Sequence, residues 1–142
     1  MQGDPHEGMT ELDGPSCWQL LAAAEVGRLA VAVAGEVEIF PINFVTDHET
    51  IVFRTAEGTK FSAAVIGPRV AFEADGYDSG AGEAWSVIVK GDAREVSMTE
   101  QLPEAAFAAL FPWHRARKDR VVRIVPGSIS GRRFPVAAHP PY

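Results

Sequence analysis

The sequence predicts a small antiparallel β-barrel that carries two or three short helices. About six short runs rich in Val, Ile, Phe and Ala alternate with turn-forming residues, which is typical of hairpin-connected strands. Only a few short segments place apolar residues at helical spacing. The length of 142 residues matches one domain, and 46% hydrophobic with 23% charged residues is typical of a globular protein. We therefore expect one mainly β domain.

The two chain ends differ from the rest in composition. Residues 1–11 lack a hydrophobic period and are expected to form a flexible arm, while the Pro-rich segment 135–142 is expected to be irregular. The domain itself should span 12–134. At its start, Asp13-Gly14-Pro15 favours a helix, because Pro is tolerated in the first turn. Apolar residues at helical spacing predict that this helix covers 15–24, with Gly27 ending it.

The remaining elements follow from β-favouring runs and the turns between them. Pro41 lies inside one such run, and because Pro cannot donate to the ladder it marks an edge, a bulge or a ligand-facing break. The three glycines of 75–82 predict a flexible loop. We expect strands over 29–33, 37–46, 50–55, 69–74, 84–96 and 120–125, and further helices over 59–67 and 98–110.

Charge and cysteine content restrict the class of protein. The net charge of −6 argues against a general nucleic-acid binder, and the single Cys17 excludes an internal disulfide. We interpret Cys17 as a buried small apolar residue. The first residues do not resemble a secretory signal, and no apolar run approaches the ~20 residues that cross a bilayer, so we expect a cytoplasmic protein without membrane association. One basic cluster is interpreted as a solvated loop or partner surface: Arg115, Arg117, Lys118, Arg120 and Arg123.

A candidate anion site follows the strand predicted at 50–55. Arg54 and Thr55 end that strand, and Thr59 and Lys60 open the next predicted helix. Free N–H groups and the positive dipole end at a helix N-terminus favour an anion, and Arg with Lys matches the charge and geometry of a phosphate. The alternative is that Arg54 is an exposed strand residue and Lys60 merely solvates a short helix.

Other candidate ligand contacts are aromatic or interrupt a strand. The break at Pro41 leaves backbone groups of Pro41-Ile42-Asn43-Phe44 free to meet a flat heterocycle, although Phe44 could equally pack in the core. Asn43 needs partners if it is buried, and a ligand would supply them. Trp85 opens an apolar strand, where a Trp packs in the core more often than it contacts a ligand. Trp113 follows the end of a predicted helix and is the better candidate for a contact with a cofactor or another subunit. The four histidines lie far apart without metal-ligand spacing, which argues against a structural zinc site.

The order of several short motifs resembles the pyridoxamine 5'-phosphate oxidase-like, FMN-binding split β-barrel family, including its nitroimidazole-resistance-like branch. The resemblance extends from Leu12 to Phe134. Each motif is weak alone, and the ordered set is specific. The motifs are Val26-Gly27-Arg28-Leu29, Pro41-Ile42-Asn43-Phe44, Phe53-Arg54-Thr55, Gly58-Thr59-Lys60, Val70-Ala71-Phe72-Glu73, Trp85-Ser86-Val87 and Ser130-Gly131-Arg132.

The resemblance implies a role for several of these residues. It places the FMN phosphate on Arg54, Thr55, Thr59 and Lys60, and the isoalloxazine ring along the Pro41–Phe44 strand, largely through main-chain atoms. An Arg near the C-terminus, Arg132, would lie close to the cofactor. The family also assembles as homodimers with the cofactor at the subunit boundary, where Trp113 would reach a neighbour's flavin.

The function expected from residues and resemblance together is flavin-mediated electron or hydride transfer to a small-molecule substrate. No side chain stands out as a general acid or base, which is consistent with a cofactor that performs the chemistry. The alternatives are a reductase that uses the deazaflavin F420, and a non-catalytic protein that binds flavin or haem. For haem, His48 is the axial ligand that the sequence offers.

Overall fold

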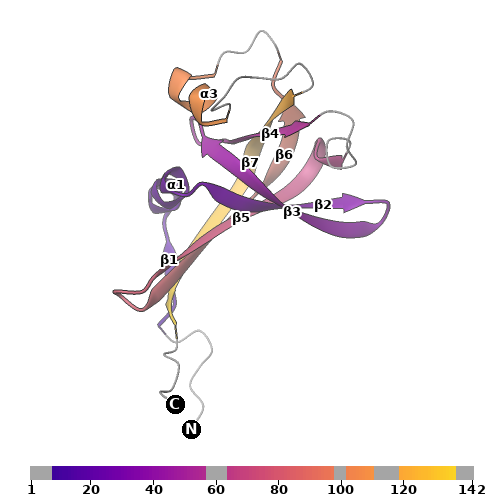
Figure 1. Cartoon of the computed structure of the whole chain (residues 1–142). Coiled ribbons are helices and arrows are strands. Elements are labelled where there is room, and N and C mark those ends of the chain that lie inside the picture. The colour runs from indigo at the N-terminus through magenta and orange to yellow at the C-terminus, as the bar shows by residue number, and fades with distance from the viewer. Residues whose placement is uncertain (1–7, 57–63, 98–101, 111–118, 137–142) are drawn as a thin grey trace, which may run out of the picture.

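Residues 8–56, 64–97, 102–110 and 119–136 are described by the computed structural model. Within them, seven antiparallel strands form one sheet in the order β1-β7-β4-β3-β2-β5-β6, and β6 also pairs with β7, so that six strands close into a ring (Figure 1). The predicted mainly β antiparallel barrel is confirmed. The elements are β1 (Thr10–Leu12), α1 (Gly14–Ala23), β2 (Val26–Val33), β3 (Glu36–Thr46), β4 (Ile51–Ala56), β5 (Gly67–Asp78), β6 (Glu83–Glu95), α3 (Glu104–Leu110) and β7 (Asp119–Pro135).

Helix α1 begins where the sequence predicts, but Gly27 does not end it. The Asp13 carboxylate accepts a hydrogen bond from the Ser16 N–H at 2.8 Å, which satisfies one free donor of the first turn. The helix ends at Ala23, before the predicted Gly27. Gly27 instead lies in β2, where a Cβ atom would come within 2.4 Å of the Phe72 ring. Its role is to make room for a core aromatic ring, so the predicted helix stop is wrong.

Three segments at the barrel ends are more regular than the sequence predicts. Thr10 and Glu11, assigned to the flexible arm, belong to β1 and pair with β7. The predicted loop 75–82 is largely the tip of the β5–β6 hairpin, whose strands stay paired as far as Asp78 and Glu83. Strand β7 runs on from the predicted 120–125 to Pro135, because β6 and β1 give it continuous partners.

The predicted helices after β4 and β6 are shorter or fall partly outside the described residues. Helix α3 begins at Glu104, whereas the sequence predicts a helix from residue 98. Most of the predicted helix over 59–67 lies outside the described residues, and Gly67 already begins β5. None of the described helices has the length and apolar character needed to cross a bilayer.

The apolar side chains form two clusters on opposite faces of the sheet. The larger cluster fills the barrel and includes Leu29, Phe44, Phe53 and Phe72. The smaller cluster lies outside the barrel beneath α3 and consists of Val52, Val96, Leu110 and Val121, with Val45 and Leu102 against it. Helix α3 therefore covers the outer face of β3, β4 and β7, at the end of the barrel opposite β1 (Figure 1).

Cys17 anchors α1 to the barrel. It is almost fully buried, as predicted, and a Cβ atom at Gly131 of β7 would lie 2.5 Å from its Sγ atom. Burial, followed by the nearby Asp13 carboxylate, raises the pKa of the Cys17 thiol. A buried thiol with a raised pKa is a poor nucleophile, so packing is the role that the structure supports.

Candidate functional site

The barrel wall parts between β3 and β4. These strands pair over three positions alone, from Phe44↔Phe53 to Thr46↔Ile51. Beyond Phe44, the Glu36–Asn43 part of β3 pairs with β2, while β4 continues along β7. In the described part of the chain, one edge of this stretch of β3 therefore has no strand partner, and Figure 1 shows the β2–β3 hairpin extending away from β4.

Pro41 lies on this open edge. The structure pairs Pro41 with Arg28 of β2 and keeps β3 continuous through it, so Pro41 marks an edge rather than a bulge. Backbone groups along the open side of an edge strand alternate between N–H donors and C=O acceptors without ladder partners. Such an edge can present hydrogen-bonding groups to a flat heterocycle.

The side chains of the Pro41–Phe44 segment divide between the two faces. Ile42 and Phe44 point into the barrel, where Phe44 meets Phe72 edge-on at 4.7 Å between ring centroids. Phe44 is therefore a core residue, which decides between its two interpretations. Pro41 and Asn43 are exposed on the outer face. The Asn43 amide can therefore hydrogen-bond to water and does not need a ligand to satisfy it.

Arg54 and Thr55 project to opposite faces of β4. Arg54 is exposed on the outer face, the same face as Asn43, because pairing of Phe44 with Phe53 puts the residues next to them in each strand on that face. Thr55 points inward and is 5% exposed. The sequence placed both side chains in one phosphate cradle, whereas the strand separates them. Thr59 and Lys60, the other members of that cradle, lie outside the described residues.

The Thr55 hydroxyl is a buried polar group without a hydrogen bond. Among the described residues it is the one buried side-chain oxygen or nitrogen for which no partner is found. Leaving a buried hydroxyl unsatisfied costs about 1–3 kcal/mol, and such groups are rare in folded proteins. Because Thr55 ends β4 next to the segment predicted to hold a phosphate, its position fits a ligand that accepts a hydrogen bond.

Trp85 and Arg132 lie at the other end of the barrel. Trp85 covers Gly76, where a Cβ atom would be 2.4 Å from the indole Nε1, and its ring packs on the core. Arg132 is exposed on β7 beside β1. Arg54 pairs with Val121, and the strand from there to Arg132 is about 35 Å long at 3.3 Å per residue. One chain does not bring these residues together, and Trp113 lies outside the described residues.

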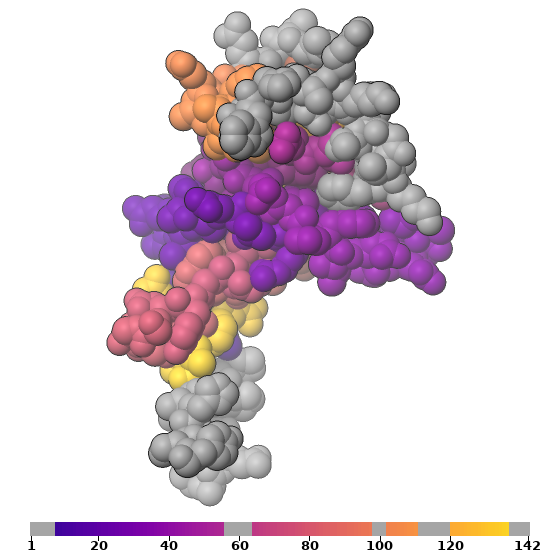
Figure 2. Space-filling view, viewed as in Figure 1, coloured from indigo at the N-terminus to yellow at the C-terminus, as the bar shows by residue number. Residues whose placement is uncertain are grey.

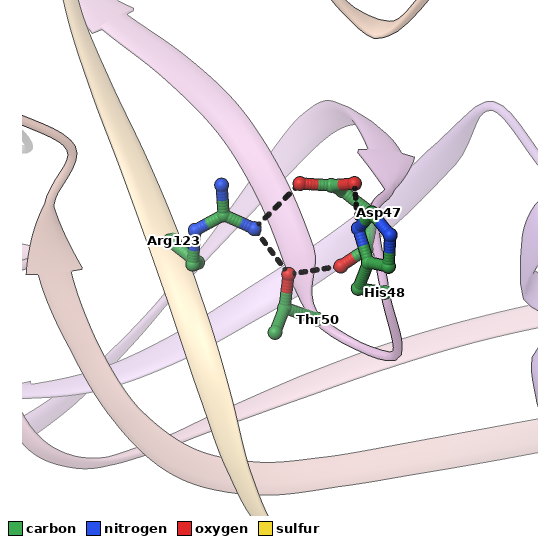
Figure 3. Close-up of polar contacts among 4 residues, drawn as sticks. All are labelled: Asp47, His48, Thr50 and Arg123. Atoms are coloured by element: carbon green, nitrogen blue, oxygen red, sulfur yellow. Dashed lines mark hydrogen bonds and ion pairs between the residues drawn. The ribbon is translucent and has the colours of Figure 1, made fainter. Parts of the chain in front are cut away.

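A buried polar network beside the β3–β4 turn was missed by the sequence analysis. Arg123 Nη1 donates to Asp47 Oδ2 at 2.9 Å and to Thr50 Oγ1 at 2.6 Å, and His48 Nδ1 lies 2.7 Å from Asp47 Oδ1 (Figure 3). The side chains of Arg123 and Asp47 are only 10% and 8% exposed. The network fastens the β3–β4 hairpin to β7. An Arg between the apolar residues of a predicted strand was the available signal.

The predicted basic cluster is therefore not one solvated loop. Arg123 is buried in β7, and Arg120, on the same strand, makes a surface ion pair with Glu95 at 3.1 Å. The other members, Arg115, Arg117 and Lys118, lie outside the described residues. His48 is held by Asp47 in an exposed turn, where its ring nitrogen Nδ1 already has a partner.

An acidic pair on β5 shares one arginine of the neighbouring strand β2. Arg28 Nη1 lies 2.9 Å from Glu73 Oε1 and 3.0 Å from Asp75 Oδ2. Burial, then a hydrogen bond with Asp75, raises the pKa of Glu73, while Arg28 opposes the shift. No group of three or more His, Cys, Asp or Glu side chains that could hold a metal ion occurs among the described residues.

Three known proteins resemble this chain over most of its length. An FAD-binding protein of Mycobacterium smegmatis is 40% identical with a TM-score of 0.70, covering 89% of this chain and 98% of that one. A Corynebacterium diphtheriae protein of unknown function is 34% identical with a TM-score of 0.72, over 90% and 99% of the two chains. An uncharacterised Mycobacterium tuberculosis protein is 35% identical over 131 residues, or 89% of this chain and 86% of its own.

The family is shown by a match over nearly the whole domain. The model that describes pyridoxamine 5'-phosphate oxidase matches residues 13–133, which contain every strand except β1 and the last residues of β7. The two solved structures share the fold over about nine tenths of this chain. The chain belongs to the pyridoxamine 5'-phosphate oxidase family.

Proposed function

We propose that this protein binds a phosphate-bearing flavin, with FMN as the first choice, and serves flavin-mediated electron or hydride transfer to a small molecule. The observation that carries the proposal is the buried Thr55 hydroxyl without a partner, at the point where β3 and β4 part. Family membership and the FAD-binding relative of Mycobacterium smegmatis support the choice of flavin. Both FMN and FAD present a phosphate beside the ribityl chain.

Different residues of the β3–β4 opening would contact the phosphate and the heterocycle of the flavin. Thr55 would donate its hydroxyl hydrogen to a phosphate oxygen, and Thr59 and Lys60 would supply charge and further donors. Arg54, on the outer face of β4, would lie on the other side of the strand from that phosphate. The open edge at Pro41–Asn43 would hydrogen-bond the heterocycle through backbone groups. When bound, the flavin supplies the redox chemistry, and the chain binds, orients and shields it. No described acid–base pair lies at the opening, so we assign no catalytic side chain.

A shared site between two copies explains why the predicted residues lie at two ends. Arg54 and Thr55 end β4, whereas Trp85 and Arg132 lie about 35 Å along β7. A single flavin is too short to reach both ends of one chain. In a twofold dimer, the Arg132 end of one copy can meet the Thr55 end of the other, which creates two equivalent sites. We therefore extend the proposal to a homodimer.

Replacing Thr55 by valine is expected to have opposite effects on stability and on binding. The isosteric methyl group removes a buried unsatisfied hydroxyl, so the flavin-free protein should gain about 1 kcal/mol in its free energy of unfolding. Flavin affinity should fall about tenfold, or about 1.4 kcal/mol, because one donor to the phosphate is lost. Urea denaturation of the flavin-free chain and flavin fluorescence titration measure the two effects.

The matched control is Ser128→Ala, which removes an exposed hydroxyl on β7 between the Thr55 and Arg132 ends of the barrel. It should change neither quantity. Absorbance and mass spectrometry of the extracted cofactor distinguish FMN, FAD, deazaflavin and haem. A Thr55→Val protein with undiminished flavin affinity would remove this hydroxyl from the site, and absence of any bound flavin would refute the proposal.

The homodimer predicts complementation between two defective chains. Thr55→Val and Arg132→Ala should each weaken both sites of their own dimer. A mixed dimer contains one site with Thr55 from one chain and Arg132 from the other, and one site with neither. The isolated mixed dimer should therefore bind flavin with wild-type affinity at half the wild-type stoichiometry, and an equimolar mixture that re-pairs at random should do so at a quarter, which titration and light scattering can measure. A monomer that binds flavin at full affinity would contradict the shared site.

A further inference from the structure

A hollow of about 610 Å³ lies between the end of α1, the last residues of β3 and α3. Its size lies within the range of small-molecule pockets. Figure 2 shows α3 (orange) above the indigo-to-purple part of the chain that contains α1 and β3. The lining residues are Ala22, Ala24, Glu25, Asn43, Phe44, Val45, Thr46, Pro103, Ala105, Ala106, Ala109 and Leu110.

We propose that this hollow binds the small-molecule substrate, and that the substrate is an apolar ring compound with N–H donors and no anionic group. The proposal rests on the flavin-binding function proposed above. It adds a location for the second ligand and a chemical class, neither of which follows from the cofactor residues.

The charges of the described residues around the hollow disfavour an anion. Among the described residues that line it, none carries a positive charge, and Glu25 is the single charged residue. A phosphate or carboxylate placed here would lose water without gaining a counter-ion, and it would face the Glu25 carboxylate. A positively charged or neutral N–H donor would be attracted to Glu25 instead.

The Asn43 side chain on the outer face of β3 can orient such a ligand. Asn43 lines the hollow, and no hydrogen bond of its side chain to another part of the described chain is found. Its amide oxygen accepts hydrogen bonds from N–H groups. Thr46 also borders the hollow, but its pairing with Ile51 of the barrel core turns its side chain to the other face of β3. The rest of the lining is mostly Ala, Pro and Leu, which suits an apolar ring.

The walls of the hollow are fixed by packing. The Phe44 N–H donates to the Glu25 carbonyl at 3.1 Å and ties the end of α1 to β3. Leu110 of α3 is 3% exposed and packs with Val52 and Val121 on the outer face of the sheet. Ala105 and Ala109 are one turn apart on α3 and line the same hollow. A preformed pocket of this kind binds ligand without first paying for ordering.

The hollow is adjacent to the proposed cofactor site and distinct from its phosphate end. Asn43 borders the hollow and is also the last residue of the open β3 edge. Thr55 points into the barrel, on the opposite face of the sheet. A ligand in the hollow would therefore lie beside the edge assigned to the heterocycle and would touch neither Thr55 nor the phosphate.

Three naphthalene compounds test the chemical class by equilibrium dialysis against the flavin-loaded protein. 2-Naphthylmethylamine is a cation, 2-naphthamide is a neutral N–H donor, and 2-naphthoate is an anion of nearly the same size. The amine and the amide should bind at least tenfold more tightly than the naphthoate. Glu25→Gln should weaken the amine several-fold and leave the amide unchanged, because only the amine depends on the carboxylate charge.

Substitutions on α3 test the location. Ala109→Trp should fill the hollow and reduce amide binding at least tenfold, and Ala109→Arg should raise naphthoate affinity above that of the amine. The matched controls are Ala108→Trp and Ala108→Arg, because Ala108 is exposed on the same helix and does not line the hollow. All four variants should keep the wild-type flavin content, since Ala109 is not assigned a cofactor contact. Ala105→Trp repeats the filling test if Ala109→Trp does not fold.

The outcomes separate the two proposals. A protein that holds flavin but binds all three compounds equally, or none, overturns the substrate class. Unchanged probe binding in the Ala109 variants overturns the location. A protein that does not bind flavin at all refutes the proposed function, and dialysis of the flavin-free chain then still reports whether the hollow selects N–H donors over anions.

Discussion

Replacing Asp47 by alanine is expected to lower the free energy of unfolding by about 3 kcal/mol, because it leaves the buried Arg123 guanidinium without its carboxylate. The two side chains meet at 2.9 Å with little exposure to water (Figure 3). Removing one partner of a buried ion pair costs about 3–5 kcal/mol. The loss should lie at the lower end of this range, because the Thr50 hydroxyl still accepts a hydrogen bond from Arg123. Urea denaturation followed by Trp fluorescence measures it.

The matched control is Glu38→Ala, which removes an exposed carboxylate from β3, the strand before Asp47, and should change stability by less than about 0.5 kcal/mol. The double variant Asp47→Ala with Arg123→Met removes both charges. It should be more stable than Asp47→Ala alone, because no unpaired charge remains buried. Equal or greater loss in the double variant would show that the pair itself, rather than the orphaned charge, dominates.

The same carboxylate predicts a pH dependence of stability. Burial is the largest influence on Asp47 and raises its pKa, but the hydrogen bonds and charges of Arg123 and His48 together hold the pKa below the ordinary value of 3.8. A group with a depressed folded-state pKa stabilises the fold above its unfolded value and loses that contribution as pH falls through the folded one. Below about pH 4, wild-type stability should therefore fall more steeply than that of Asp47→Asn.

Gly131→Ala is expected to cost about 2–3 kcal/mol of stability, since overpacking a close contact between elements forces them apart. The new methyl group would lie 2.5 Å from Cys17 Sγ, 3.2 Å from Val87 and 3.3 Å from the Ser86 carbonyl oxygen. Helix α1 would have to move off β7. Thermal denaturation measures the loss, and Gly127→Ala is the control, because its nearest neighbour would be 3.6 Å away.

The Gly131 prediction has an internal rescue. Cys17→Ala removes the nearest atom, so the double variant with Gly131→Ala should recover part of the lost stability. The remaining approaches to Val87 and Ser86 are short enough to keep the rescue incomplete. If the stability losses of Cys17→Ala and Gly131→Ala simply added in the double variant, the contact between α1 and β7 would not be the cause of the Gly131→Ala loss.

Local sequence signals predicted the strands well and their lengths poorly. The runs around Leu29, Val52 and Val122 are strongly β-favouring, and each forms a strand where expected. The end of β7, with its Gly, Ser and Arg residues, has no such preference, and it is a strand because β6 pairs with it along its whole length. Long-range pairing of this kind overrides local preference and leaves no periodic signal in the sequence.

The candidate site was predicted as a set of residues rather than as an arrangement. The sequence correctly singled out the end of β4, yet adjacent strand residues face opposite ways, so Arg54 and Thr55 could not share one surface. The Asp47–Arg123 pair joins residues 76 positions apart, a partnership that only the closed barrel reveals. The lining of the hollow joins α1, β3 and α3, and Ala residues far apart in sequence carry no signal of a shared wall.

The open edge of β3 also bears on the tendency of the chain to self-associate. An unpaired strand edge with apolar neighbours is a template onto which another extended chain can add, which is the first step of aggregation. Val37 and Ile39 are 73% and 66% exposed beside this edge. Pro41 denies an incoming strand one donor, and the charges of Glu36 and Glu38 repel copies of the same hairpin. Pro41 and the two glutamates thus hinder the self-assembly that this unpaired edge would otherwise invite.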